Sequence, residues 1–337
     1  MTSKPSSRQT RPEVEELLAL DRSVLGWARQ LPPGWSEVRD VPLDAVLRKV
    51  TSGGVSFDFE GVPRSVPRAP ETDEAGRGAL PRSACPMTGV DKSATGMDEA
   101  GRGATPRSAD PMIGMDEAGC GATPRSAYPM VGMDEAGRGA LAGPVTVGCV
   151  SLPLASLDAD SLLLRSFRGL GDSKKIAPKT RARLFEAIAA CAAWSVGCAS
   201  AREVDQLGIV AACSRAARRA LVALQLPAGE IEVLFLDRGL HLDSRAPGGS
   251  PRLPKRQVTL TRADAQSLHV SAASIMAKVW RDRWMCGIDG RVPGFAFAQH
   301  KGYGTAAHRA AIAHQGLSRI HRRSFLGSLE ASKSQSC

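Results

Sequence analysis

Four acidic residues stand at or just after the ends of apolar, strand-like runs, a placement that can build a metal site. Asp134 and Glu135 directly follow the run PMVGM, and Asp237 directly follows IEVLFL. Asp264 comes four residues after the run KRQVTL. Carboxylates at the ends of buried strands lie at the rim of a sheet, and three or four that converge cannot all stay ionised without a cation. Oxygen ligands of this kind are typical of Mg²⁺ where phosphate also binds.

Each acidic residue also has a simpler explanation when it is taken alone. A short acidic side chain commonly caps a helix or a turn, or pairs with a nearby arginine. Asp282 lies between Arg281 and Arg283 inside an expected helix, and we interpret it in this way, as a helix-surface ion pair. The metal interpretation therefore depends on the four carboxylates coming together in the fold.

Glycine, basic and aromatic residues mark further segments that suit a nucleic acid. The turn Gly137–Gly139 lets the backbone approach a ligand closely, although it also fits an ordinary turn between strands. Two lysines follow Ser173 before an expected helix and could contact phosphate or form a solvated charge run. Tyr303 stands on a glycine-flanked turn. If its ring is exposed, it can stack on a base or sugar; if the ring is buried, it belongs to the core. His321–Arg323 could likewise contact phosphate or solvent.

The hexapeptide DEAGRG, which holds the first two acids, has near-copies that begin at Asp73, Asp98 and Asp116. Only the last copy continues into a long apolar stretch, LAGPVTVGCV, whereas the others run into segments rich in Gly, Pro, Ala, Ser and Arg. Units of that composition bury too little apolar surface to offset the entropy of ordering them, although a fixed repeat could also form a solenoid. We therefore expect residues 73–129 to be a disordered linker, and a chain that starts near Tyr128 to fold and act on its own.

The elements that must position these groups fall within residues 130–326, which we expect to form one domain. The expected strands are Met130–Met133, Val145–Leu152, Glu232–Leu236 and Lys255–Leu260, and the expected helices are Pro178–Ala193, Ala201–Leu224, Val270–Trp284 and Ala306–His314. Strands and helices interleaved in this way indicate an α/β layered domain. Residues 1–72 are expected to be an N-terminal extension, largely irregular apart from a helix at Glu13–Leu31, and residues 327–337 a flexible tail.

Composition narrows the class of protein. The chain has 337 residues, is 43% hydrophobic and carries a formal net charge of +10, which favours polyanionic partners such as nucleic acid. Its apolar runs are shorter than the ~20 residues of a membrane span, so we expect no membrane association. Eight cysteines without a CxxC pair or zinc spacing indicate reduced thiols in an intracellular protein. We expect it in the cytoplasm, because acidic residues follow early in the N-terminal segment and argue against an organelle transit peptide.

Taken in order, the motifs resemble those of the type 2 ribonuclease H family, ribonuclease HII. The matching stretches are GMDEAGRGALAGPV, GLGDSKKIAPKTRARLFEAI, FLDRG, RADAQSLHVSAASIMAKVWRDRWM, FAQHKGYGTAAH and IHRRSF, from about Val131 to Phe325. The resemblance implies an RNase H-like fold, a mixed five-stranded sheet flanked by helices with a C-terminal helical part.

The resemblance also implies a role for each candidate residue. Asp134, Glu135, Asp237 and Asp264 match the family's metal-binding acids. Gly137, Arg138 and Gly139 match the turn that reads the ribose 2′-hydroxyl, and Tyr303 matches the tyrosine that packs on the sugar at the junction between ribose and deoxyribose. Ser173, Lys174 and Lys175 match a loop near the nucleic-acid backbone.

These roles imply a metal-dependent endoribonuclease that uses two divalent cations, Mg²⁺ or Mn²⁺. Its substrates would be RNA–DNA hybrids and duplex DNA with embedded ribonucleotides, cut to leave a 5′-phosphate and a 3′-hydroxyl by a monomeric catalytic domain. This chain departs from the family at Arg238, where glycine often follows the third acid, and at Arg262, where lysine is usual.

Two alternatives stay open at this point. Ribonuclease HIII is a sister family, but it typically has glutamate at the fourth acidic position, where this chain has Asp264. A catalytically silent nucleic-acid-binding protein is the alternative from another class, although all four acids are present.

Overall fold

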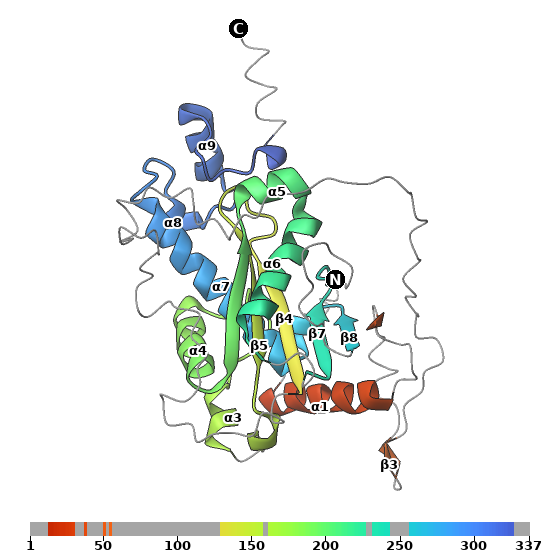
Figure 1. Ribbon diagram of the computed structural model, residues 1–337. Coiled ribbons are helices and arrows are strands. Elements are labelled where there is room, and N and C mark those ends of the chain that lie inside the picture. Colours follow the sequence, from red (N-terminus) through yellow and green to blue (C-terminus); the bar gives the residue numbers. More distant parts are fainter. Residues whose placement is uncertain are drawn as a thin grey trace, which may run out of the picture.

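The computed structural model describes residues 13–30, 37–38, 50–51, 54–55, 129–157, 161–226, 231–242 and 256–326 (Figure 1). The expected linker lies outside these ranges except for its last residue, Pro129, and the expected tail at 327–337 lies outside them altogether. Both therefore stay predictions.

A mixed sheet forms the centre of the molecule, with the strand order β1-β8-β7-β4-β5-β6. Its strands are β1 (Glu37–Val38), β4 (Met130–Ala136), β5 (Val145–Ser151), β6 (Ala193–Ala199), β7 (Val233–Asp237) and β8 (Arg256–Leu260). β4, β7, β8 and β1 are parallel neighbours, whereas β5 runs antiparallel to both β4 and β6. The five longer strands confirm the expected five-stranded mixed sheet, and the two-residue β1 adds an edge. β2 (Val50–Thr51) and β3 (Gly54–Val55) form a separate pair.

The longer helices lie where the sequence expectation placed helical segments, except that the expected helix Ala201–Leu224 is divided at Gly208 into two helices. The helices are α1 (Val14–Gln30), α3 (Leu162–Ser166), α4 (Pro178–Cys191), α5 (Ala201–Leu207), α6 (Ile209–Ala223), α7 (Leu268–Asp289), α8 (Phe297–His300) and α9 (Ala306–Gln315), with 3₁₀ turns at Leu154–Ser156 (η3), Ala263–Ala265 (η4) and Arg323–Phe325 (η5). No helix in these described ranges is long and apolar enough to cross a membrane.

The expectation missed strand β6. The expected helix at Pro178–Ala193 ends at Cys191, and Ala193 begins the strand instead. Alternate residues of β6 are buried, as expected for an edge strand with one face on the core. Because it is short and directly follows the alanine-rich end of α4, its period of two is hard to separate from helical periodicity.

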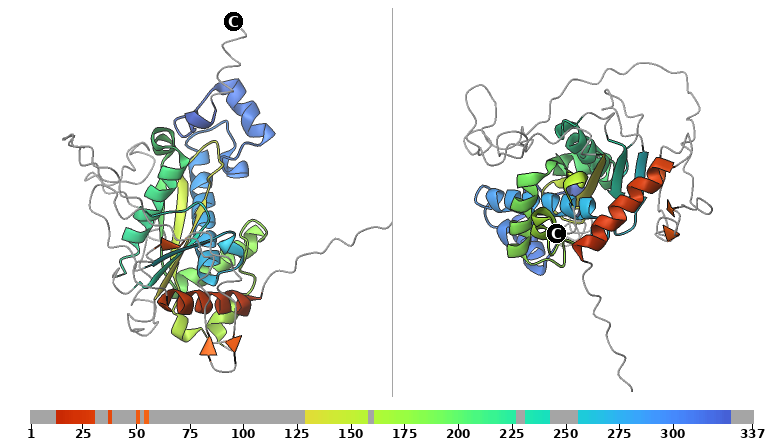
Figure 2. Two further views of the ribbon diagram at one scale, coloured as in Figure 1. Left: turned by 90° about the vertical axis from the view of Figure 1, so that its right-hand side faces the viewer. Right: turned by 90° about the horizontal axis from the view of Figure 1, so that it is seen from below.

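Helices cover both faces of the sheet (Figures 1 and 2). One core joins α1, α3, α4 and α7 to the sheet, and a second joins α5 and α6 to the opposite face. A third, smaller core holds the end of α7 together with α8 and α9, the expected C-terminal helical part. The central helix α7 lies against β4 and β5, and β4 carries the first two acids.

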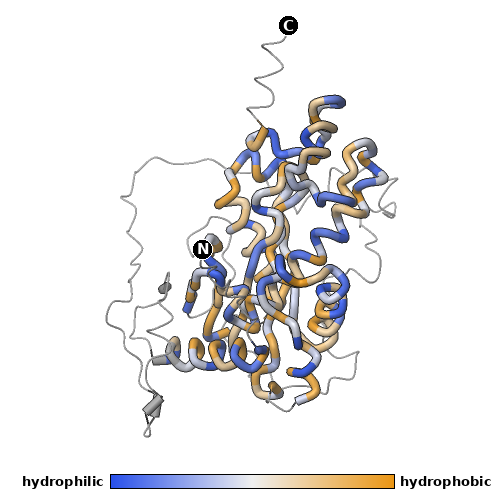
Figure 3. Tube along the Cα trace, turned by 180° about the vertical axis from the view of Figure 1, so that it is seen from behind, coloured by the Kyte–Doolittle hydropathy of each residue, from blue (hydrophilic) through white to orange (hydrophobic). Residues whose placement is uncertain are grey.

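Helix α1 belongs to the first of these cores, although it lies far upstream of β4 in the sequence. Polar and apolar residues alternate along it at one end of the sheet (Figure 3), and its buried residues include Leu17, Leu18 and Val24. The helix contacts α3 and α7. This packing is at odds with the expectation that a chain starting near Tyr128 folds alone, because such a chain would lack part of its core.

Candidate active site

The sheet register brings three of the expected acids together. Parallel β4 and β7 pair Met133 with Leu236, so Asp134 and Asp237 follow side by side at the carboxyl ends of adjacent strands. Glu135 is the next residue of β4. β8 lies on the other side of β7, and the chain leaves it into η4, which carries Asp264. The sheet therefore places the four acids along one edge, three on β4 and β7 and Asp264 in the turn that follows β8.

Burial and mutual repulsion act strongly on the acids of β4. Burial, followed by the neighbouring charges of Glu135 and Asp237, raises the pKa of Asp134 well above its ordinary value, against a hydrogen bond from Ser274. Burial also raises the pKa of Glu135, although the guanidinium of Arg138 opposes this shift. Both carboxyl groups therefore resist ionisation unless positive charge is nearby.

The other two acids lie in the same electrostatic environment. Burial raises the pKa of Asp237 to about 6, helped by the charges of Asp264 and Glu135 and opposed by the Ala263 N–H, which donates to Oδ1 of Asp237 at 2.7 Å. The pKa of Asp264 is also raised, by burial and then by the charge of Asp172. Asp172 is an acid that the sequence expectation missed, although it lies within the GDSKK segment quoted there.

The donor chemistry of this cluster fits divalent cations, although the side chains are not arranged as a finished metal cage. Among the described residues, no group of three acidic, histidine or cysteine side chains is placed to hold a metal ion as it stands. All four expected ligands nevertheless offer oxygen, the donor that Mg²⁺ and Mn²⁺ prefer. The buried Oε2 atom of Glu135 has no hydrogen-bond partner in the protein. Small side-chain rotations toward a cation would relieve both this unsatisfied oxygen and the mutual repulsion.

The turn after β4 points its arginine back to the acids. Arg138 Nη1 lies 3.2 Å from Oε1 of Glu135 and donates to the Gly239 carbonyl at 3.3 Å. Gly137 has a φ of +85°, and a Cβ atom there would overlap the guanidinium of Arg281. Glycine is therefore required at this position by both backbone conformation and space.

Two buried guanidinium groups hold the loop that follows this turn. Arg281 donates to the carbonyls of Ala142, Pro144 and Lys301 at 2.9 to 3.0 Å. Arg322 donates to the carbonyls of Gly143 and Arg138, also at 2.9 to 3.0 Å. The sequence expectation placed Arg322 in a segment that contacts phosphate or solvent. It is instead fully buried, since it satisfies loop carbonyls that have no strand partner.

The tyrosine turn is joined to the same loop. The backbone N–H groups of Leu141 and Ala142 donate to the Gly302 carbonyl at 2.8 and 3.2 Å. The ring of Tyr303 lies 5.3 Å from both Lys278 Nζ and the Arg281 guanidinium carbon. Arg281 therefore ties the loop that follows the GRG turn to the tyrosine turn.

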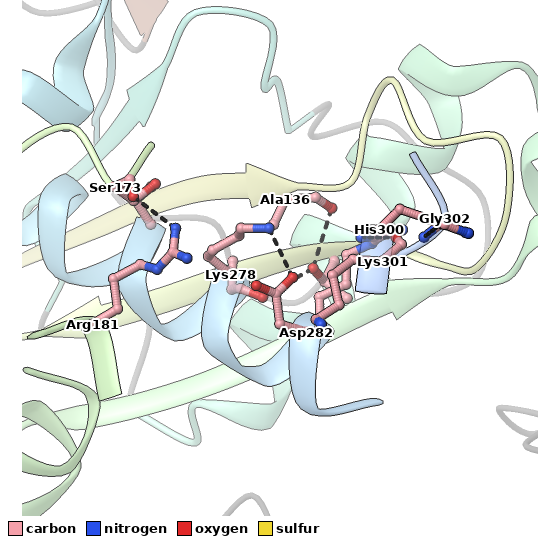
Figure 4. Close-up of polar contacts among 12 residues, drawn as sticks. Ala136, Ser173, Arg181, Lys278, Asp282, His300, Lys301 and Gly302 are labelled. Atoms are coloured by element: carbon pink, nitrogen blue, oxygen red, sulfur yellow. Dashed lines mark hydrogen bonds and ion pairs between the residues drawn. The ribbon is translucent and has the colours of Figure 1, made fainter. Parts of the chain in front are cut away.

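The loop Ser173–Lys175 lies beside the acids, and its three residues differ in burial and in what they contact. Ser173 is buried: its hydroxyl bonds Ser274 at 2.8 Å, and its carbonyl accepts from Arg181 at 3.0 Å (Figure 4). The charge of Lys174 lowers the pKa of both Glu135 and Asp264, so this lysine lies close to the carboxylates. Lys175 is exposed, where it can meet a polyanion.

Asp282 is confirmed as a partner in a helix ion pair. Its Oδ1 atom lies 2.8 Å from Lys278 Nζ, one helical turn earlier on α7, and the two side chains point toward each other (Figure 4). Spacing of four residues along a helix suits such a pair. Asp282 therefore has a structural explanation of its own.

The raised carboxyl pKa values predict that the metal-free protein becomes less stable as pH rises. The pKa of Asp237 moves from 3.8 to about 6 in the fold. Between these two pH values the Asp237 carboxyl group is protonated in the folded protein but ionised in the unfolded chain. The contribution of this group to the free energy of unfolding is therefore favourable below pH 4 and is lost as the pH rises through 6. We expect the Tm in EDTA to fall over this window. Asp237→Asn should flatten the profile, and a wild-type Tm that follows that of the variant at every pH would contradict this account.

Comparison with known proteins places this site in a family. The family model for Ribonuclease HII matches residues 131–327. Ribonuclease HII of Syntrophotalea carbinolica is 45% identical over 189 residues, which cover 56% of this chain and 80% of the relative. Ribonuclease HII of Synechococcus sp. (strain JA-3-3Ab) is 44% identical over 187 residues, covering 55% and 76%. A chain in the structure of the PCNA:RNase HII complex from Archaeoglobus fulgidus is 25% identical with a TM-score of 0.44, covering 57% of this chain and 93% of that one.

The matched residues contain the four acids, the GRG turn and Tyr303. They also make up more than half of the 337 residues. This chain belongs to the ribonuclease HII family.

Proposed function

We propose that this protein, a nuclease by family, hydrolyses the RNA strand of RNA–DNA hybrids and also cuts at ribonucleotides embedded in duplex DNA. The observation that carries the proposal is the gathering of four buried or half-buried carboxylates beside a glycine turn. Asp134 and Asp237 lie next to each other on adjacent parallel strands, and the charges of Glu135, Asp237 and Asp264 all raise the pKa of Asp134. Such a cluster suits a site that is completed by cations.

Asp134, Glu135, Asp237 and Asp264 would hold two divalent cations, Mg²⁺ or Mn²⁺. When bound, the cations supply an activated water and stabilise the oxygen that leaves. The acids would fix the position of the cations, because three of these acids lie on or directly at the end of strands of one sheet. The products would carry a 5′-phosphate and a 3′-hydroxyl.

Selection of a ribonucleotide requires contact with the 2′-hydroxyl, the group that distinguishes RNA from DNA. We propose that the turn Gly137-Arg138-Gly139 reads this group and that Tyr303 packs on the adjacent sugar. Buried Arg281 supports this proposal, because it fills the space beside Gly137 and donates to the Lys301 carbonyl in the tyrosine turn, which favours a constant separation of the two contacts. Lys174 and Lys175 would contact the backbone phosphates.

The experiment is a cleavage assay of the whole protein on three duplexes. One contains a single ribonucleotide, one is an RNA–DNA hybrid, and one is all DNA. With Mg²⁺ we expect cleavage of the first two at the ribonucleotides and none of the third, and EDTA should abolish it. If folded protein binds the duplexes without cutting any of them, the silent nucleic-acid-binding alternative is correct.

A further inference from the structure

Helix α1 carries a fully buried acidic residue that reaches the first turn of α7. One carboxyl oxygen of Asp21, Oδ2, accepts the backbone N–H of His269 at 3.0 Å and lies 2.7 Å from Nδ1 of the same residue. Both side chains have no exposed surface. The contact joins two parts of the chain that are 248 residues apart, and of the two residues only Asp21 lies outside residues 131–327, which match the family model.

Packing alone does not explain Asp21. The second oxygen, Oδ1, and the Nε2 atom of His269 are buried without a hydrogen-bond partner in the protein. A half-satisfied buried polar pair is generally less favourable than an apolar residue of similar size. The helix also has other anchors, because Arg22 donates to the Leu157 carbonyl at 2.7 Å and Arg29 pairs with Glu232 at 2.7 Å.

Asp21 instead completes the N-terminus of α7. Ser267 caps the helix by accepting the Val270 N–H at 3.1 Å, and Asp21 accepts the His269 N–H, one residue earlier. Free N–H groups at a helix start need acceptors, and a negative group there is favoured by the helix dipole. The orientation of the first turn of α7 is therefore set partly by a residue of α1.

This first turn is connected to two of the expected metal ligands. The Ser271 hydroxyl donates to the Asp264 carbonyl oxygen, and the Ser267 N–H donates to the Ala263 carbonyl at 2.8 Å. The Ala263 N–H in turn donates to Oδ1 of Asp237 at 2.7 Å. A shift of the turn would move η4, and with it Asp264 and the partner of Asp237.

The first turn of α7 also packs closely against β4. A Cβ atom at Gly132 would overlap the His269 backbone, so helix and strand touch two residues before Asp134. Further along, α7 continues to pack against β4. The carboxylates of β4 and η4 are thus both set by where α7 begins.

We propose that Asp21 is a positioning residue of the active site, one that fixes the start of α7 and so the relative placement of Asp264, Asp237 and Asp134. Its effect on metal use rests on the proposed function. The folded catalytic unit therefore begins at α1, and the DEAGRG-containing array is an insertion between α1 and β4.

The test uses the full chain with Asp21→Leu, Asp21→Asn and a matched control, Leu17→Ala, which removes buried apolar surface from the same helix. Outer-shell substitutions typically weaken metal affinity by 10- to 100-fold. We expect Asp21→Leu to raise the Mg²⁺ concentration for half-maximal cleavage by about tenfold. Asp21→Asn, which keeps one acceptor oxygen, should have a smaller effect. Leu17→Ala should lower the Tm but leave the Mg²⁺ midpoint unchanged.

Hydrogen exchange measured by mass spectrometry gives a readout that does not need activity. Amides at Leu268–Ser271 should exchange faster in Asp21→Leu, or in Asp21→Asn if the leucine variant does not fold, than in Leu17→Ala. If the Asp21 variants only lower the Tm, with the Mg²⁺ midpoint and local exchange matching Leu17→Ala, the residue is merely structural and the proposal is wrong. If the wild type cleaves nothing, the proposed function fails, while the exchange result still decides the role of Asp21.

Discussion

Asp134→Asn is expected to lower kcat on a ribonucleotide-containing duplex by roughly a thousand-fold or more, in the range seen when a central catalytic group is lost. Asparagine keeps the shape of the side chain but loses the charge that would hold a cation. Asp134 is also the acid whose pKa is raised by all three of its acidic neighbours, so it lies at the centre of the cluster. Steady-state cleavage with saturating substrate and Mg²⁺ measures the effect.

The repeats supply the matched control. Asp116→Asn changes the equivalent acid of an upstream copy, whose sequence lacks the apolar stretch that follows Asp134, and it should leave kcat unchanged. Because Asp134→Asn also removes a carboxyl group whose ionisation is disfavoured by burial and by neighbouring charges, its Tm in EDTA at neutral pH should equal or exceed that of the wild type. Equal activity of the Asp134 variant would mean that another copy can occupy the site. A lower Tm together with low activity would point to misfolding.

A chain that starts at Tyr128 is expected to be insoluble or unfolded, which is the second large effect. Such a chain lacks α1 and exposes the surfaces that its buried leucines and valines cover. Each large apolar side chain stabilises the fold by about 1.5–3 kcal/mol. Leu17, Leu18, Val24 and Leu25 together therefore contribute an amount comparable with the 5–15 kcal/mol that stabilises a typical domain. Circular dichroism and thermal unfolding of the purified chain measure the loss.

Deleting residues 73–127 while keeping α1 is the matching control. We expect this shorter protein to unfold at a Tm close to that of the full chain, since the deletion leaves every described contact in place. A folded, active protein from the Tyr128 start would show that α1 is dispensable, and would also remove the basis of the role proposed for Asp21.

Much of the site was predictable from the sequence because it depends on local features. The acids at Asp134 and Asp237 end apolar runs, and a run of apolar residues predicts a buried strand whatever its partners are. Adjacent parallel strands then bring their carboxyl ends to one edge of the sheet. The difference between the last DEAGRG copy and the other three was also local, because only the last copy is followed by the apolar stretch that forms β5.

The tertiary structure decided the roles of residues whose partners are distant in the chain. Periodicity predicted α1 but could not reveal that Asp21 meets His269, and a basic segment near the C-terminus gave no sign that Arg322 is buried. Asp172 gained its place beside Asp264 in the same way. Hydrophobic patterning reports which face of an element is buried, whereas the partner of a charged group depends on which carbonyl, amide or carboxyl group the fold places within about 3 Å of it.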